Sequence, residues 1–148
     1  ASSLVGSEMC IRDSSYSKKL NCGLALCHKH RKKPNEIAEM TVIGDVSGKD
    51  VLIIDDMCDT AGTLTKAADL LMDKGAVSVR AFCTHAVLSG PAYERIDASQ
   101  LTELIVTDTI PLKGKSDKIR VITVADLFSD VIKKLISNES ISSHFVIS

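Results

Sequence analysis

Several common functional signals are missing from this chain of 148 residues. The formal net charge is only −1, which gives neither the basic field that binds nucleic acid nor an acidic tail. No apolar run approaches the ~20 residues that a membrane-spanning helix needs. Hydrophobic residues make up 45% of the chain and charged residues 25%. The composition therefore predicts one soluble globular domain with an ample core and with no nucleic-acid or membrane partner.

The cysteines lack the spacing of a metal or disulfide site. There are five of them, an odd number, and no pair is spaced C-x-x-C: Cys10, Cys22, Cys27, Cys58 and Cys83. Neither a disulfide framework nor a zinc knuckle is indicated. Cys22, Cys27 and Cys83 stand among apolar residues, so we expect them to be small core residues. Free thiols of this kind are typical of a reducing cytosol, and we expect a cytoplasmic location.

The first residues differ in character from the rest of the chain. Residues 1–15, "ASSLVGSEMCIRDSS", show no clear helical or strand period and are rich in serine. They resemble translated sequencing adaptors. We therefore expect them to be an artefactual or disordered leader outside the fold, and we assign residues 16–148 to one domain.

Beyond the leader, strand-like and helix-like segments alternate. Leu64, Ala67, Ala68 and Leu71 lie at i, i+3, i+4 and i+7, which predicts one helix face, and Gly75 is placed to end that helix. The alternation predicts an α/β fold with a doubly wound parallel sheet. The predicted strands are 22–27, 39–46, 51–54, 77–83, 103–107 and 119–123, and the predicted helices are 63–74, 91–96 and one with apolar residues from 124 to 135.

The stretch "VLIIDDMCDTAGTL" (51–64) joins a buried strand to a helix through small residues. In an open parallel sheet, ligands bind beyond the carboxyl ends of the strands. The helix that follows would begin with unpaired backbone N–H groups and a positive dipole end. Ala61 and Gly62 would let a phosphate approach these groups, and Thr60 and Thr63 offer hydroxyls. The alternative is an ordinary strand–turn–helix in which Thr63 is only the N-cap.

Asp55 and Asp56 need a separate explanation, because two carboxylates beside a phosphate repel it. Sugar hydroxyls can donate to such a pair, and Mg²⁺ binds carboxylate oxygen directly or through water. The stretch therefore predicts a site for a phosphorylated polyol, with backbone for the phosphate and carboxylates for hydroxyls or metal. It is not a Walker A loop, because the G-x-x-x-x-G-K pattern and its lysine are absent.

The acidic pair, small loop and helix resemble the ribose-phosphate-binding motif of type I phosphoribosyltransferases. A wider resemblance is to the ribose-phosphate pyrophosphokinase (phosphoribosyl pyrophosphate synthetase) family. "DDMCDTAGTL" is similar to the family's ribose 5-phosphate loop, and "CTHAVLSGPAYERI" (83–96) to the segment that follows it. "KHRKKPNE" (29–36) is similar to the flexible catalytic loop, with its Lys-x-Arg pair before Pro-Asn. The resemblance covers about residues 16–148.

This resemblance implies transfer of the diphosphoryl group of ATP to the 1-hydroxyl of ribose 5-phosphate, giving phosphoribosyl pyrophosphate and AMP. Lys29 and Arg31 would close onto the phosphates as catalytic residues. This is reasonable because phosphoryl transfer depends on positioning and on cations at the developing charge. Asp55 and Asp56 would hold the ribose 2- and 3-hydroxyls and Mg²⁺, directly or through water. The residues implied to hold the 5-phosphate are Asp59, Thr60, Ala61, Gly62 and Thr63.

The resemblance also implies regulation and assembly. Ser140 and Ser142 match serines of a regulatory site between subunits, but Ser143 and His144 depart from the usual aromatic–apolar pair. Family members are hexamers of about twice this length, whose N-terminal half brings the ATP-binding loop. We therefore expect that the chain derives from a family of homo-oligomers. We do not expect these 148 residues alone to assemble normally or to synthesise phosphoribosyl pyrophosphate.

Two other functions share part of the pattern. A nucleobase phosphoribosyltransferase would carry the loop after Asp56, but has no reason to combine "KHRKKPN" with "CTHAVLSGPA". A non-catalytic regulatory subunit associated with the synthetase usually has altered loops, whereas Lys29 and Arg31 are present here. His85 would reach the same sheet edge, as either a core or a site histidine. The turn 89–91 is another possible anion site.

Overall fold

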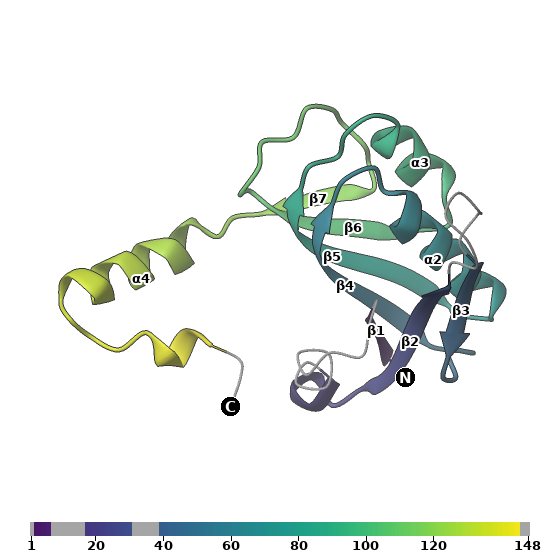
Figure 1. The fold of residues 1–148 in the computed structure, drawn as a ribbon, viewed down its shortest axis with the longest axis horizontal. Helices are drawn as coiled ribbons and strands as arrows, with labels where there is room; N and C mark the ends of the chain where they lie inside the picture. The colour runs from purple at the N-terminus through teal and green to yellow at the C-terminus, as the bar shows by residue number, and fades with distance from the viewer. Residues whose placement is uncertain (1, 7–16, 31–38, 146–148) are drawn as a thin grey trace.

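The computed structural model describes residues 2–6, 17–30 and 39–145, and this part of the chain contains a seven-stranded sheet of order β3-β2-β1-β4-β5-β6-β7 (Figure 1). All neighbouring strands are parallel except β2 and β3, which form an antiparallel edge pair. The predicted α/β fold is confirmed, and the antiparallel edge is an addition to it. The strands are β1 (Ser2–Gly6), β2 (Gly23–His30), β3 (Glu39–Ile43), β4 (Asp50–Cys58), β5 (Ser78–Ala86), β6 (Glu103–Thr107) and β7 (Ile119–Ile122).

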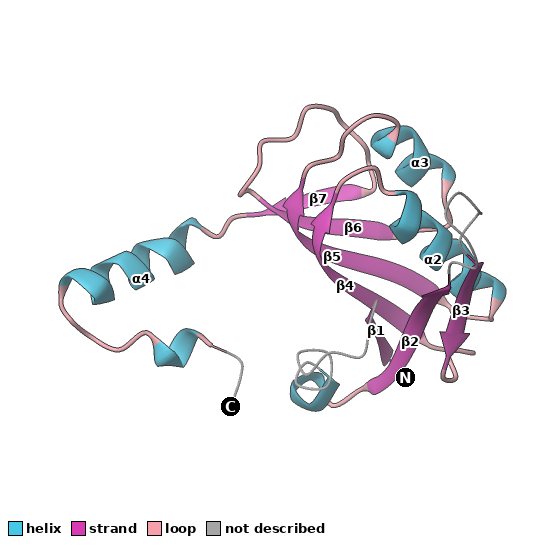
Figure 2. Ribbon diagram, in the orientation of Figure 1, coloured by secondary structure: helices cyan, strands magenta, loops and turns pink. Residues whose placement is uncertain are grey.

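Helices alternate with the later strands (Figure 2). The helices that follow β4 are α2 (Gly62–Asp73), α3 (Ala92–Ala98), α4 (Ala125–Ile136) and the short 3₁₀ helix η1 (Ser142–His144). Helix α2 buries the predicted face, and Lys74 is its C-cap. Gly75 follows with φ 90° and donates its N–H to Met72 O, so it ends the helix as expected. None of the helices in the described part of the chain is long and apolar enough to cross a membrane.

The core lies between α2 and the middle of the sheet. Alternate residues of β4 and β5 are buried, because successive side chains of a strand point to opposite faces. Ala67 and Ala68 are small, which lets α2 lie close to the sheet, and Leu71 is fully buried. Cys27 and Cys83 are core residues as predicted, whereas Cys22 is only half-buried. Cys58 is buried as well. Besides Leu71 and Cys83, the largest fully buried side chains are those of Ile96, Leu101, Leu104, Val79 and Val106.

Strand β1 corrects the expectation that residues 1–15 lie outside the fold. Its backbone pairs in parallel with β2 on one side and β4 on the other, with Leu4 opposite both Leu24 and Leu52. Without it, the facing edges of β2 and β4 would lack main-chain partners. Its sequence, "SSLVG", has only two large apolar residues between serines and a glycine, so it lacks the apolar run that marked the other strands. Residues 7–15 lie outside the described part of the chain.

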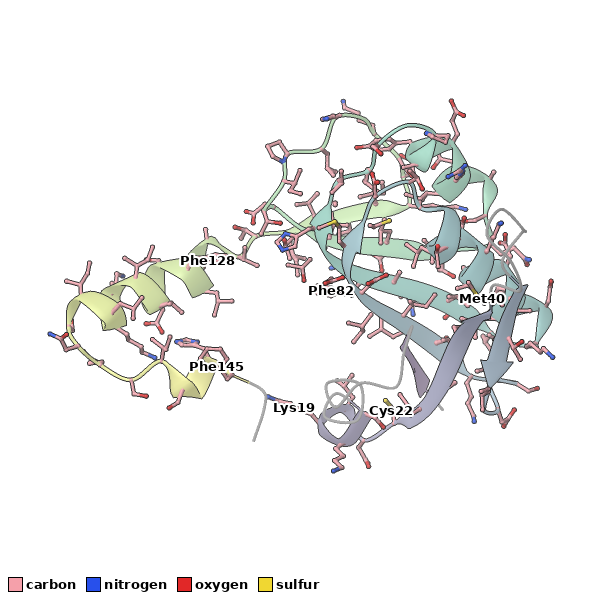
Figure 3. The ribbon with its side chains drawn as sticks, viewed as in Figure 1. Lys19, Cys22, Met40, Phe82, Phe128 and Phe145 are labelled. Carbon is pink, nitrogen blue, oxygen red and sulfur yellow. The ribbon has the colours of Figure 1, made fainter. Side chains whose placement is uncertain are left out.

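Helix α4 projects away from the sheet instead of packing on it (Figure 1). It buries none of its residues, and its apolar side chains remain largely exposed. The tail returns along this helix, where His144 Nε2 lies 2.7 Å from Asp130 Oδ2. Phe128 and Phe145 both belong to this projecting unit (Figure 3). The sheet with α2 and α3 therefore forms the packed body, and α4 with η1 forms an arm.

Candidate functional site

The predicted acidic pair lies on a strand, not in a loop. Strand β4 continues to Cys58, four residues beyond the predicted end at Ile54. Strand β5 is equally long and supplies backbone partners along this extension, with Asp55 opposite Cys83 and Cys58 opposite Ala86. The end of β4 that carries Asp55 and Asp56 is thus held by pairing with β5. The backbone of the two carboxylates is therefore more rigid than it would be in a loop.

Asp55 and Asp56 occupy different surroundings. The Asp55 side chain is half-buried and Asp56 is exposed, and the Asp56 N–H donates to Asp55 Oδ1 over 2.9 Å. Burial raises the pKa of Asp55 above its ordinary value, and the side chain and charge of the neighbouring Asp56 act in the same direction, whereas the backbone hydrogen bonds from Asp56 and Met57 lower it. A group in this position benefits from a cation or from donors that stabilise its ionised form.

The carboxylates fit the oxygen chemistry of Mg²⁺. No group of three or more His, Cys, Asp or Glu side chains suited to a metal gathers within residues 2–6, 17–30 and 39–145. Mg²⁺ is commonly held by one or two carboxylates, with water and substrate oxygens completing its shell. Asp55 and Asp56 could therefore hold the ion together with a ligand that brings its own oxygens.

Residues 59–63, here named the phosphate loop, turn sharply into α2. Ala61 is the N-cap, with φ 57° and ψ 1°, and is almost fully buried. The Thr65 N–H and hydroxyl both donate to Ala61 O over 2.9 Å, which tightens the first turn. The helix begins at Gly62 without a side-chain cap, so the alternative in which Thr63 is the N-cap is wrong. The first N–H groups of a helix have no acceptor within it, and an anion can serve as their partner.

The other predicted site residues are placed differently by the described structure. Lys29 lies near the carboxyl end of β2, which runs in the same direction as β1 and β4, so its backbone is at the same edge of the sheet as the end of β4. The Lys29 backbone pairs with Met40 in the β2–β3 ladder, and Arg31 lies outside the described residues. Ser140 and Ser142 lie on the arm, with their hydroxyls 2.8 Å apart and the Ser142 N–H donating to Ser140 Oγ. Within the described residues, no hydrogen bond joins either serine to the phosphate loop, and their regulatory role stays a prediction.

His85 is held by a group of hydroxyls at the ends of β5 and β6. Its Nδ1 lies 3.0 Å from Thr109 Oγ1. The hydroxyls of Thr107 and Thr109 both donate to Thr84 O, over 2.7 and 3.0 Å. These contacts favour a structural histidine that fastens the loop after β6.

The sequence analysis missed Arg95. Its guanidinium Nη1 donates to Thr60 O over 2.9 Å, although the two residues are 35 positions apart. Ser89, considered only as part of a separate anion site, donates its hydroxyl to Asp59. Neither contact can be predicted from the sequence without knowing that the segment after β5 folds over the phosphate loop.

Comparison with known proteins shows the family of this chain. Residues 29–146 match the family described as the phosphoribosyl synthetase-associated domain. The chain belongs to this family. It is 54% identical over 132 residues to a ribose-phosphate pyrophosphokinase of Porphyromonas gingivalis, covering 89% of this chain and 42% of the relative. The corresponding enzyme of Campylobacter jejuni is 50% identical over 135 residues, covering 91% of this chain and 44% of the relative. The chain thus spans less than half the length of these relatives.

Solved structures agree with the family fold. A phosphoribosylpyrophosphate synthetase from Mycobacterium smegmatis superposes with a TM-score of 0.83 at 32% identity, over 93% of this chain and 45% of that one. An adenine phosphoribosyltransferase from Giardia lamblia superposes with a TM-score of 0.55 at 18% identity, over 72% of this chain and 67% of that one. The second likeness shows a shared fold only.

Proposed function

We propose that this phosphoribosyl synthetase-associated domain binds ribose 5-phosphate for a ribose-phosphate diphosphokinase reaction. In that reaction the diphosphoryl group of ATP passes to the ribose 1-hydroxyl, and phosphoribosyl pyrophosphate and AMP are formed. The observation that supports the proposal is the joining of two features at one sheet edge. The Asp55–Asp56 pair lies near the carboxyl end of β4, and five residues after Asp56 the chain turns through Ala61 into a helix without a side-chain cap.

In this proposal the two ends of the sugar phosphate are bound by different chemistry. The 5-phosphate accepts hydrogen bonds at the phosphate loop, and the ribose 2- and 3-hydroxyls donate to Asp55 and Asp56. Asp55 and Asp56 would hold Mg²⁺ directly or through water, and the ion would supply positive charge at the site. The hydroxyl donors and the ion would stabilise the ionised form of the half-buried Asp55 carboxylate, which its burial disfavours.

Lys29 and Arg31 complete the proposal as the cations that approach the phosphates during transfer. The Lys29 backbone belongs to the β2–β3 ladder, one residue before its last pair, His30 with Glu39, and Arg31 follows in the sequence. Cations placed at the developing charge are the main protein contribution to phosphoryl transfer. The ATP site, the assembly into a homo-oligomer and a cytoplasmic location are further parts of the proposal, inferred from the named relatives.

Calorimetric titration of the chain with ribose 5-phosphate, with and without Mg²⁺, tests this function. We expect weak binding that strengthens with Mg²⁺ and is lost in Asp55→Asn and Asp56→Asn. Asp73→Asn, at the far end of α2, makes the same charge change and should bind normally. We also expect no release of AMP from ATP by this chain alone. Wild-type binding that is equal with ribose 5-phosphate and with free ribose would contradict the assignment of the phosphate loop.

A further inference from the structure

The segment from the end of β5 to α3 packs directly onto the phosphate loop. The Leu88 N–H donates to Cys58 O over 3.1 Å, and the Ser89 N–H donates to Asp59 O over 3.0 Å. Leu88 is almost fully buried and has φ 45°, a backbone conformation that costs energy for a branched residue. The chain therefore maintains a strained turn at the place where it contacts the phosphate loop.

The Ser89 side chain explains how the loop tolerates an acid. A carboxylate close to a bound phosphate would repel it, and Asp59 stands at the start of the phosphate loop. The Ser89 hydroxyl donates to Asp59 Oδ1, which holds the carboxylate against the β5–α3 segment. Asp59 is thus a contact between two loops. It is suited to shaping the phosphate loop, and any bond it offers to a phosphate would come from its backbone.

Arg95 makes the third contact and brings a positive charge. Its Nη1 donates to Thr60 O, and a Cβ at Gly62 would lie 3.1 Å from the same nitrogen. The guanidinium is therefore in contact with the loop at the first residue of α2. The phosphate loop itself contains no basic residue. Arg95 has further donors beyond the one that Thr60 uses, since a guanidinium carries five N–H groups.

We propose that Arg95 is a positioning residue of the 5-phosphate site, which holds the phosphate loop through Thr60 and supplies the cation that offsets Asp59. This inference rests on the proposed function, since it assigns the ligand's phosphate to that loop. Two contributions follow from it. The hydrogen bond to Thr60 O keeps the loop in shape, and the charge attracts the phosphate.

Three substitutions separate these contributions. Arg95→Gln keeps a donor for Thr60 O but removes the charge, Arg95→Lys keeps the charge but removes the planar fork, and Arg95→Met removes both. Lys74→Met, at the other end of α2, is the matched control for loss of one positive charge. The dissociation constant for ribose 5-phosphate is measured at low and high salt. Amide exchange of residues 59–63 reports the shape of the loop.

We expect Arg95→Met and Arg95→Gln to weaken binding by ~10-fold or more at low salt, which is what loss of a charged partner typically costs. The difference from wild type should shrink at high salt, and Arg95→Lys should recover much of the affinity. Amide exchange in the loop should rise in Arg95→Met and stay near wild type in Arg95→Gln. If Arg95 only stabilised the fold, the salt dependence of ribose 5-phosphate binding would not change with the charge at position 95.

The outcomes distinguish this inference from the proposed function. If wild type binds ribose 5-phosphate and both neutral variants bind within about twofold of it, the role of Arg95 is overturned while the function stands. If wild type does not bind, the function itself fails. Should Arg95→Met unfold, the comparison of Arg95→Gln with Arg95→Lys still decides whether the charge matters.

Discussion

At the scale of single residues, the Asp55 carboxylate proposed to bind the ligand is expected to lower the stability of the fold. Its pKa is raised in the fold, chiefly by burial, so ionisation is less favourable in the folded than in the unfolded chain. The contribution of this carboxyl to stability therefore falls as pH rises from its unfolded pKa through the raised folded one. We expect Asp55→Asn to match wild type in melting temperature near pH 3 and to exceed it, on the order of a few degrees, at pH 7. Thermal unfolding at both pH values measures this, and a less stable variant at pH 7 would contradict it.

The same scale shows what residue types could and could not predict. Asp55, Asp56 and Gly62 were predicted as site residues from their order along the chain, because a strand–turn–helix site uses neighbouring positions, and that role stays a prediction. Arg95 was not, because its contact with Thr60 depends on how the turn after β5 closes. Hydrogen bonds between distant segments leave no periodic pattern in a sequence.

At the scale of elements, α2 and α4 have similar amphipathic patterns but different surroundings. Leu71 of α2 is fully buried, whereas Leu135 of α4 is 58% exposed. We expect Leu71→Ala to lower the free energy of unfolding by about 2–5 kcal/mol, and Leu135→Ala to change it by less than about 0.5 kcal/mol. Urea titration of the two variants gives both values. An equal loss would mean that α4 packs on the body in solution.

The elements were easier to predict than their ends and partners. The helix 63–74 was placed within one residue, because its apolar spacing and Gly75 both mark it. Strand β4 was cut short at Ile54 because two acids looked like its end, yet pairing with β5 carries it to Cys58. Pairing with β5 alone therefore extends the strand beyond its apolar run, since the pairs between β1 and β4 end at Ile53.

At the scale of the whole molecule, the proposed reaction is tested in a longer chain, because these 148 residues span less than half the length of the named relatives. In a protein that joins this chain to the remaining segment found in its relatives, we expect Lys29→Ala to lower kcat on the order of 10²–10³-fold with little change in KM. Lys33→Ala, in the same basic stretch, should have a much smaller effect. Steady-state kinetics, with melting temperature as the check on folding, makes the comparison. Equal losses in both variants would indicate a diffuse basic patch instead of a catalytic pair.

The position of β1 bears on the order in which the chain acquires its structure. Strands β4 to β7 are neighbours both along the chain and across the sheet, so their contacts close short loops. Strand β1 pairs with β4 across a separation of about 48 residues, as in Leu4 opposite Leu52, and such contacts form late because loop closure costs entropy. On the ribosome, β1 is made well before β4. It must remain without that partner until the sheet's centre has been synthesised, which is an interval in which unpaired strand edges favour misassembly.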